Sequence, residues 1–315
     1  MTIDVQIVAD SISAHSGKRL TTFVTRYPRF IHSEVMTHRV FARNASSSRA
    51  IPIQKMIKQI TEDPAMPERW GRNGKGMQDH GPLSVEEETE AKRLWLQARD
   101  GTLSVVGKML ARPEQPHKQI VNRLLEPWQH INVIITTTEL TNFFALRYHA
   151  DADPTIEVLA RKMWEAYEAS EPAELEHGQW HLPLVDMEDR AAIRQYLAEA
   201  GTGHEESEAE ITKLMLKLST ARCARVSYND HYGKRPTIAK DLELHDLLVA
   251  GHPKHASPAE HQATPDTGKM VDAPLSKVEW KWTRPALHGP LVGWCQYRKT
   301  IPGENITSFS RSPTA

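Results

Sequence analysis

The pattern of apolar and polar positions along the chain predicts a mixture of strands and helices. Val5–Val8 and Leu20–Thr25 read as strands, and Ile131–Thr138, rich in Ile, Val and Thr, reads as a buried strand. Ser84 with Glu87 three residues later forms a capping box. It predicts a helix whose buried face carries Ala91, Leu94 and Ala98.

Two further helices are predicted downstream. Asp153 followed by Pro154 is a typical helix start. The apolar stripe of this helix is Ile156, Leu159, Met163 and Tyr167. A third helix is expected over residues 189–200, and the polar stretch 201–207 after it reads as a linker.

Composition narrows the range of partners. Lys and Arg number 39 against 40 Asp and Glu, giving a net charge of -1, so a nucleic-acid polymer, which needs many basic contacts, is not expected. A mononucleotide needs only a local basic pocket. Two cysteines, Cys223 and Cys295, exclude a disulfide framework and fit a reducing compartment. Residues 1–8 carry neither a basic region nor a long apolar run, so we expect a cytoplasmic protein without membrane association.

No metal site is expected from the sequence. The chain has a group of neighbouring histidines at His245, His252, His255 and His261. No Cys accompanies them, and their intervals do not fit a helix-borne zinc pair.

The segment His38–Arg49 has the composition of an anion-binding site. Its arginines, serines and asparagine offer many hydrogen-bond donors with little bulk, which suits phosphate. The alternative interpretation is a solvated, Ser-rich loop with surface arginines. The segment also resembles the signature of flavin-dependent thymidylate synthases, in which Arg-His-Arg is followed by Ser and Arg. Here residues 37–39 occupy the first slot, and Asn44, Ser47 and Arg49 match later positions.

Two more blocks resemble the same family. Residues 123–127 and 142–147 are similar to its Arg-x-x-x-Pro turn and its Asn-Phe-Leu-x-Leu-Arg element. Residues 224–228 and 255–261 are similar to flavin-binding elements that ordinarily precede the Arg-His-Arg motif. Because these elements follow the Arg-His-Arg motif here, the resemblance implies a circularly permuted member of the family. Circular permutation costs little stability when the chain ends lie close together.

The resemblance implies an α+β fold, with a central, mainly antiparallel sheet flanked by helices. Residues 1–200 would form the nucleotide-binding part, and 201–315 the permuted flavin-binding segment with a C-terminal extension, together one catalytic domain. By resemblance, reduced FAD transfers the one-carbon unit of 5,10-methylenetetrahydrofolate to C5 of dUMP, giving dTMP, with NADPH as reductant. No enzyme nucleophile is needed, so neither cysteine is expected to attack the base. A homotetramer is expected, because the family's sites draw on several subunits.

The resemblance also assigns residue roles. The expected FAD-binding residues are His38, Arg39, Asn44, Asn142, Ser227, His255, Ser257 and Glu260. The expected nucleotide-binding residues are Glu34, Ser47, Ser48, Arg49, Arg123 and Arg147. Among these, Ser47, Arg123 and Arg147 are the catalytic candidates, with Arg123 near the phosphate and Arg147 polarising the pyrimidine.

Departures from the family pattern leave the substrate open. Thr37 replaces an Arg, Glu34 replaces a Gln that lies near the nucleotide, and Asp151 stands where a flavin-contacting His is expected. The same scaffold could therefore transfer a hydroxymethyl or other one-carbon unit to a deoxypyrimidine monophosphate for DNA-base modification. A flavin- or nucleotide-binding protein without turnover is the third hypothesis.

Three segments have no counterpart in the family pattern: 63–82, 178–183 and 265–315. Within the last, Gln296 and Arg298 are candidates for the substrate site. The alternative for this tail is a surface helix or a subunit contact.

Overall fold

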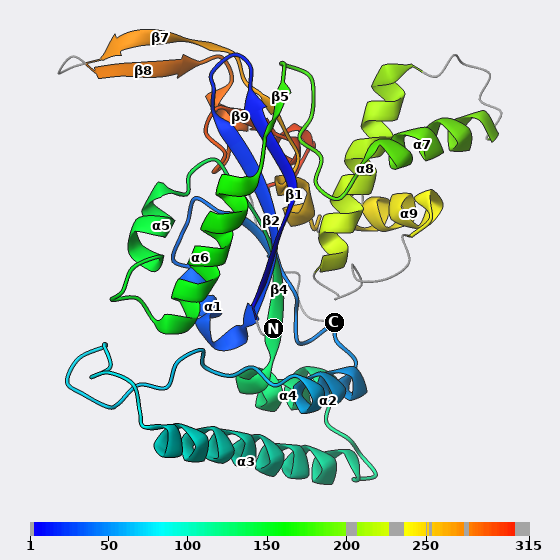
Figure 1. Cartoon of the computed structure of the whole chain (residues 1–315). Coiled ribbons are helices and arrows are strands. Elements are labelled where there is room, and N and C mark those ends of the chain that lie inside the picture. Colours follow the sequence, from blue (N-terminus) through cyan, green and yellow to red (C-terminus); the bar gives the residue numbers. More distant parts are fainter. Residues whose placement is uncertain are drawn as a thin grey trace, which may run out of the picture. The chain divides into compact units, whose positions relative to one another are not determined.

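The computed structural model describes residues 3–199, 207–226, 236–249, 251, 254–273 and 277–305. Within them the chain forms helices and three separate sheets, so the predicted α+β class is confirmed (Figure 1). Ser227 and His252, singled out above, lie outside the described residues. The circular permutation stays a prediction.

The chain forms two compact units, each built from segments that are distant in sequence. The first unit comprises residues 1–8, 21–171 and 225–233, and the second comprises 9–20, 172–224 and 234–315. Two long strands, β1 (Asp4–Ser13) and β2 (Arg19–Pro28), contribute residues to both units.

A sheet has the strand order β3-β4-β2-β1-β5, and its strands β2, β3 and β4 with the start of β1 carry the core of the first unit. β4 (His130–Thr137) is buried throughout and pairs antiparallel with β2 and with β3 (Ala42–Ala45). The pairing of Phe23 with Ile135 fixes the register, so that alternate residues of β2 and β4 share a face. The strands predicted at 5–8, 20–25 and 131–138 are thereby confirmed, but β1 and β2 run five and three residues further than predicted.

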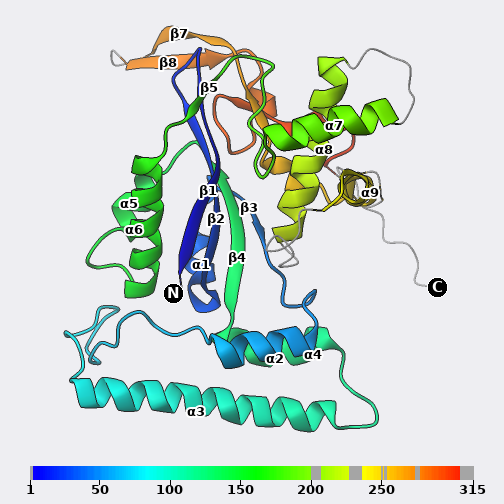
Figure 2. The same ribbon diagram turned by 45° about the vertical axis from the view of Figure 1, so that its right-hand side comes forward.

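Helices α5 (Thr141–Arg147) and α6 (Pro154–Ala169) cover one face of this sheet (Figure 2). Asp153 caps α6 as predicted, because its carboxylate accepts hydrogen bonds from the backbone N–H groups of Thr155 and Ile156. The stripe of Ile156, Leu159 and Met163 is fully buried against Phe23, Tyr27 and Val133. Burial of this stripe therefore fixes α6 on the sheet.

A second hydrophobic cluster joins α2 (Ile53–Glu62), α3 (Val85–Leu110) and α4 (Lys118–Leu125). The capping box of Ser84 and Glu87 is present, as predicted. The predicted buried face of α3 is wrong, however, since Leu94 is 50% exposed and Ala98 is also exposed. α3 instead packs through Trp95, Leu103 and Val106. These residues lie on a neighbouring stripe of the same helix.

The second unit combines a three-helix cluster with short strands. Helices α7 (Met187–Glu199), α8 (Glu208–Val226) and α9 (Ile238–Val249) bury Ile193, Leu197, Ile211, Met215 and Leu218. Buried Arg222 of α8 pairs with Asp189 at 2.7 Å and Asp241 at 3.0 Å, so one guanidinium bridges two buried carboxylates. The helix predicted over 189–200 is confirmed.

The strands of the second unit pair sequence-distant segments. β5 (Ala173–Leu175) pairs with the end of β1, and β6 (Ala263–Pro265) pairs antiparallel with β9 (Trp294–Gln296). A hairpin of β7 (Gly268–Ala273) and β8 (Lys277–Trp282) lies between β6 and β9 in sequence. Short 3-10 helices complete the unit: η3 (Ser257–Glu260), η5 (Pro285–Leu287) and η6 (Tyr297–Thr300).

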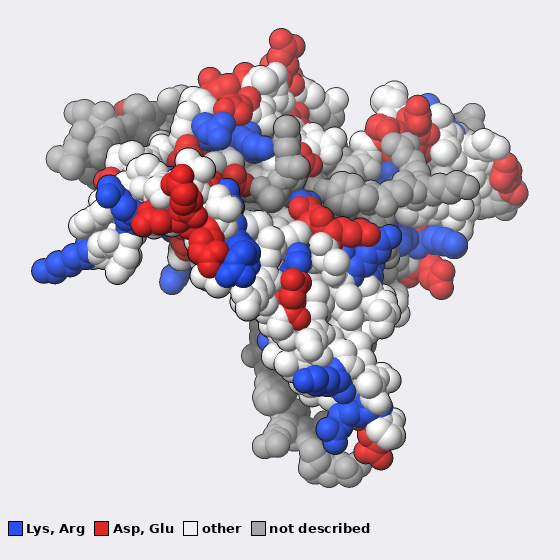
Figure 3. All heavy atoms as spheres, turned by 60° about the horizontal axis from the view of Figure 1, so that its bottom comes forward, with Lys and Arg blue, Asp and Glu red and all other residues white. Residues whose placement is uncertain are grey.

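Charge is mixed on the surface. On the face drawn in Figure 3, basic and acidic side chains are interspersed, in keeping with a net charge of -1. Within the described residues, no helix has both the length and the apolar character needed to cross a bilayer.

Candidate functional site

Arg147, the last residue of α5, is held by three side chains from one short segment. Its Nη1 donates to Glu34 Oε2 at 3.0 Å, its Nη2 to Thr37 Oγ1 at 3.3 Å, and its Nε to His38 Nε2 at 3.2 Å. Glu34 lies in α1 (His32–Val35), and the other two residues follow in the next turn. The structure thus brings Arg147 to Glu34 and His38, which lie more than 100 residues earlier in the sequence.

Local packing orients this segment. Val35 is fully buried, and Arg43 donates to the carbonyl oxygens of Val35 and His38 at 3.2 Å each. The His38 ring stacks on Phe41 and meets Phe143 edge-on at 4.9 Å. One aromatic residue from each of the two motifs therefore holds the imidazole in place.

The electrostatics of the cluster keep His38 neutral. Burial lowers its pKa first, and the positive charges of Arg147 and Arg43 lower it further. A neutral ring leaves the Nε2 lone pair free to accept from Arg147. Burial raises the pKa of Glu34, and Asp153 adds to this effect while Arg147 opposes it.

Beside this cluster lies a pocket of about 810 Å³, a size suited to a small molecule. The lining residues are Glu34, Arg69, Met77, Gln78, Asp79, Ala145, Leu146, Arg147, His149, Ala150, Asp151, Ala152, Asp153 and Pro154. Four of them come from the 63–82 segment, which sequence reasoning left without a role. The backbone bridge between Gly71 and Pro82 closes that segment into a loop, and only the enrichment in Gly and Pro hinted at it.

The Ser-rich segment forms hydrogen bonds with α4 and with Glu126 just after that helix. Ser48 donates to Glu126 Oε1 at 2.6 Å, and Asn122 Nδ2 donates to the carbonyl oxygens of Ser48 and Ile51 at 2.6 and 2.9 Å. Ser47 is half-buried. Several other predicted contacts point to solvent and do not line the pocket: Arg39, Arg49, Arg123 and Asn142.

The side-chain amide of Asn44 is a buried hydrogen-bond donor. It lies in β3 opposite Ile134, is only 8% exposed, and its Nδ2 has no hydrogen-bond partner among the described residues. An unpaired buried amide costs about 1–3 kcal/mol, so a ligand that accepts from it would be favoured. The side chain therefore fits the predicted role in holding a cofactor.

The second unit carries the 255–261 motif. His255 and Ser257 are exposed, while Glu260 is half-buried and forms an ion pair with Arg298. Gln296 Nε2 donates to the Glu260 carbonyl oxygen at 2.8 Å. Gln296 also pairs with Ala263 where β9 meets β6. Gln296 and Arg298 of the unplaced tail thus contact the predicted flavin motif, a link with no signal in local sequence.

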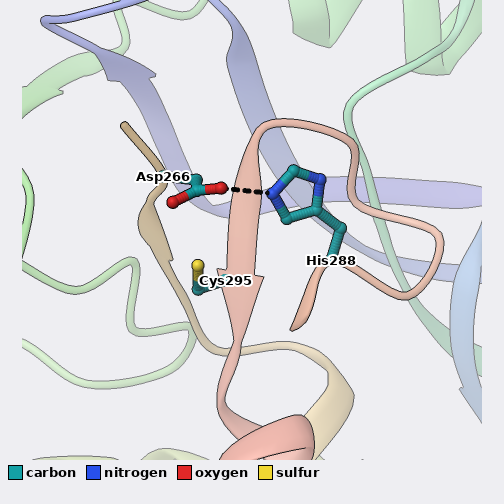
Figure 4. A group of neighbouring side chains, drawn as sticks. All are labelled: Asp266, His288 and Cys295. Carbon is teal, nitrogen blue, oxygen red and sulfur yellow. Dashed lines mark hydrogen bonds and ion pairs between the residues drawn. The ribbon is translucent and has the colours of Figure 1, made fainter. Parts of the chain in front are cut away.

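Asp266, His288 and Cys295 form a buried group with metal-ligating side chains (Figure 4). The Asp266 carboxylate accepts from His288 Nε2 at 2.9 Å, from two N–H groups of Arg284 at 2.8 and 3.3 Å, and from the Thr267 backbone at 2.9 Å. The Nδ1 atom of His288 accepts from the Gly293 N–H. Because the lone pairs of Asp266 and His288 are engaged in this way, the group is a self-contained hydrogen-bond network that organises the loop before β9.

Both cysteines are buried thiols. Burial raises the pKa of Cys295 to about 11, and the nearby Asp266 carboxylate adds to the shift. Burial also raises the pKa of Cys223 strongly, against hydrogen bonds from Ser219 and Gln262 that lower it. Neither thiol is therefore a ready nucleophile near neutral pH.

No protein-family model matches the chain, and no curated protein sequence does. Among solved structures, it is similar to the UMP/dUMP methylase PolB from Streptomyces cacaoi bound with 5-Br UMP, at 18% identity and a TM-score of 0.42, over 52% of this chain and 88% of PolB. The complex of PolB with 5-Br dUMP gives 18% identity and a TM-score of 0.43, over 52% and 89%.

Proposed function

We propose that the chain is a flavin-dependent one-carbon transferase that acts at C5 of a deoxypyrimidine monophosphate. The observation that supports this proposal best is the convergence of Glu34 and His38 on Arg147, since Glu34 and Arg147 line one pocket. The family resemblance assigned these residues to one site from separate motifs. Nothing in composition makes them partners.

Arg147 would stabilise negative charge that develops on the pyrimidine ring. Its three side-chain partners hold the guanidinium before substrate arrives, so little reorganisation is needed during reaction. FAD, when bound, would supply the hydride and mediate transfer from methylenetetrahydrofolate. The buried, protonated state of Cys223 and Cys295 favours this route over thiolate addition to the base.

Asn44, His38 and Arg39 are the proposed FAD contacts of the first unit. The role that the resemblance gives to His255, Ser257 and Glu260 stays a prediction. Arg49 and Arg123 are proposed to bind the nucleotide phosphate. Their exposure fits side chains that serve another subunit of a tetramer, as the resemblance implies.

A direct test combines cofactor and product analysis. Purified protein should carry or take up FAD, seen as flavin absorbance. Incubation with dUMP or dCMP, methylenetetrahydrofolate and NADPH should give a C5-substituted nucleotide by mass spectrometry, whose mass distinguishes methyl from hydroxymethyl. Colourless protein that fails to bind added FAD would refute the proposal, and bound FAD without any product would leave a binding protein without turnover.

The phosphate assignment has its own test. Arg49→Ala and Arg123→Ala should each weaken nucleotide binding roughly ten- to hundredfold while FAD binding is kept. Arg161→Ala is the matched control, because Arg161 pairs only with Glu157 and Glu165 on the surface of α6 in the described structure. Wild-type nucleotide affinity in both variants would contradict the alignment.

A further inference from the structure

Glu34 and Arg147 present a carboxylate and a guanidinium side by side in the pocket. Arg147 Nη1 donates to Glu34 Oε2 at 3.0 Å, so acceptor and donor groups form one continuous edge. A guanidinium has five N–H donors, and within the described residues Glu34, Thr37 and His38 use three of them. Two N–H groups remain for a ligand, next to a carboxylate whose second oxygen can also accept.

This order of groups complements cytosine. Along its pairing edge cytosine offers an amine that donates, then N3 and O2 that accept. An acceptor from Glu34 followed by two donors from Arg147 matches all three groups. Uracil offers O4, N3–H and O2, so the carboxylate would face an acceptor and a guanidinium N–H would face a donor. Unpaired or opposed polar groups in a pocket give large discrimination.

The other carboxylates of the pocket are less suited to this role. Asp153 caps α6, with one oxygen accepting from backbone N–H groups at 2.8 and 3.2 Å. Asp79 forms an ion pair with Arg69, and Asp151 is exposed. Glu34 is therefore the carboxylate placed to read a base together with Arg147.

We propose that this edge selects cytosine and that the acceptor substrate is deoxycytidine monophosphate. The inference rests on the function proposed above and refines it. A Gln at position 34, expected from the resemblance, carries both a donor and an acceptor and can serve uracil. An ionised Glu offers acceptors only and so suits the cytosine amine. A Gln whose Oε1 accepts from Arg147 would turn its NH2 toward the base, where it suits O4 of uracil and opposes that amine.

The test is a calorimetric titration of the full chain, saturated with FAD, with dCMP and separately with dUMP. We expect dCMP to bind roughly ten- to hundredfold more tightly, the discrimination that a well-placed base contact provides. Glu34→Gln should abolish or reverse the preference while dUMP affinity rises or is kept. Its melting temperature should be measured alongside to verify folding.

Two control variants define which carboxylate acts. Glu157→Gln changes another partly buried, Arg-paired glutamate on α6 and should leave the preference intact. Asp151→Asn changes a second carboxylate of the same pocket and should also leave it intact. A preference that shifts with Asp151 and not with Glu34 would overturn the assignment.

The outcomes separate the two proposals. If neither nucleotide binds, the proposed function fails, and the base assignment fails with it. If both bind and dUMP is preferred, the transferase proposal stands and the cytosine proposal is wrong. If dCMP is preferred equally by wild type and Glu34→Gln, the base is read elsewhere, and the role of Glu34 is refuted.

Discussion

Arg147 shows how the environment of one residue can prepare a charge for chemistry. A lone surface arginine samples many rotamers, and ordering it costs free energy each time it acts. Here Glu34, Thr37 and His38 hold the Arg147 guanidinium by hydrogen bonds. The imidazole of His38 can accept such a bond because burial and two arginines lower its pKa and keep the ring neutral. The entropy lost on ordering the Arg147 side chain is therefore lost during folding and not during catalysis.

Arg147→Ala should lower kcat by about 100- to 1000-fold, in the range found when a charge-stabilising donor is lost, with a smaller effect on nucleotide affinity. Arg147→Lys should recover little activity, because an ammonium cannot reproduce the planar contacts. Steady-state kinetics and calorimetry on the same samples measure both quantities. With Arg161→Ala as control, an equal loss of kcat and binding would instead indicate a ground-state role.

The cysteines provide a second test at this scale. A variant with both Cys223→Ser and Cys295→Ser should retain turnover, since burial keeps both thiols protonated near neutral pH. Each serine places a hydroxyl in a buried site, so the variant is compared with wild type at a lower temperature if its melting temperature falls. Loss of activity in folded, flavin-loaded Cys295→Ser would show covalent catalysis by that thiol.

Among the elements, α3 departs most from its sequence pattern. The apolar stripe through Leu94, Ala98 and Val105 faces solvent in the single chain, with Leu94 50% and Val105 49% exposed. Trp95, Leu103 and Val106 on the adjacent stripe make the contacts within the chain. A helix with two apolar stripes is suited to pack on its own chain through one and on a second copy of the chain through the other.

Leu94→Glu combined with Val105→Glu should therefore reduce the oligomeric state while the folded chain is preserved. Light scattering after gel filtration measures the mass, and circular dichroism verifies the helix content. Glu90→Lys, on an exposed and already charged position of the same helix, serves as the control. A wild-type protein that is monomeric would contradict the predicted tetramer, and an unchanged mass in the double variant would place the interface elsewhere.

At the scale of the whole molecule, several buried histidines make the fold sensitive to acid. Burial lowers the pKa of His181 and of His261 to about 3, and of His32 and His130 to about 4. In the unfolded chain these groups take up protons below about pH 6.5. The folded state binds fewer protons, so its stability is fully present above pH 6.5 and declines as pH falls toward the folded pKa values.

The free energy of unfolding in urea should consequently fall between pH 7.5 and 5, by about 2 kcal/mol at pH 5 for His181 alone. His181→Asn should reduce that fall by about 2 kcal/mol at pH 5, because one of the four titrating imidazoles is removed and three remain. His149→Asn, which removes an exposed imidazole, should leave it unchanged. A stability that is constant across this range would show that the buried histidines do not control acid unfolding.

Local chemistry in the sequence determined the start and type of the predicted elements. The Ser84 and Asp153 caps and the run of β-branched residues in β4 act through neighbours in the chain, so pattern alone revealed them. The family resemblance also placed His38 and Arg147 in one predicted site, and the structure brings the two side chains into hydrogen-bond contact. The patterns predicted a mixture of strands and helices, and the resemblance implied the α+β class.

Only the tertiary structure decided which segments meet around these motifs. The 63–82 loop lines the pocket, His181 bridges to Ala263, and the tail pairs with β6 beside Glu260. It also decided which stripe of α3 is buried within the chain. These outcomes depend on long-range burial and on pairing between backbones far apart in sequence, and neither leaves a periodic mark in the residues involved. The sequence thus identified the chemical groups, and packing selected the neighbours with which they act.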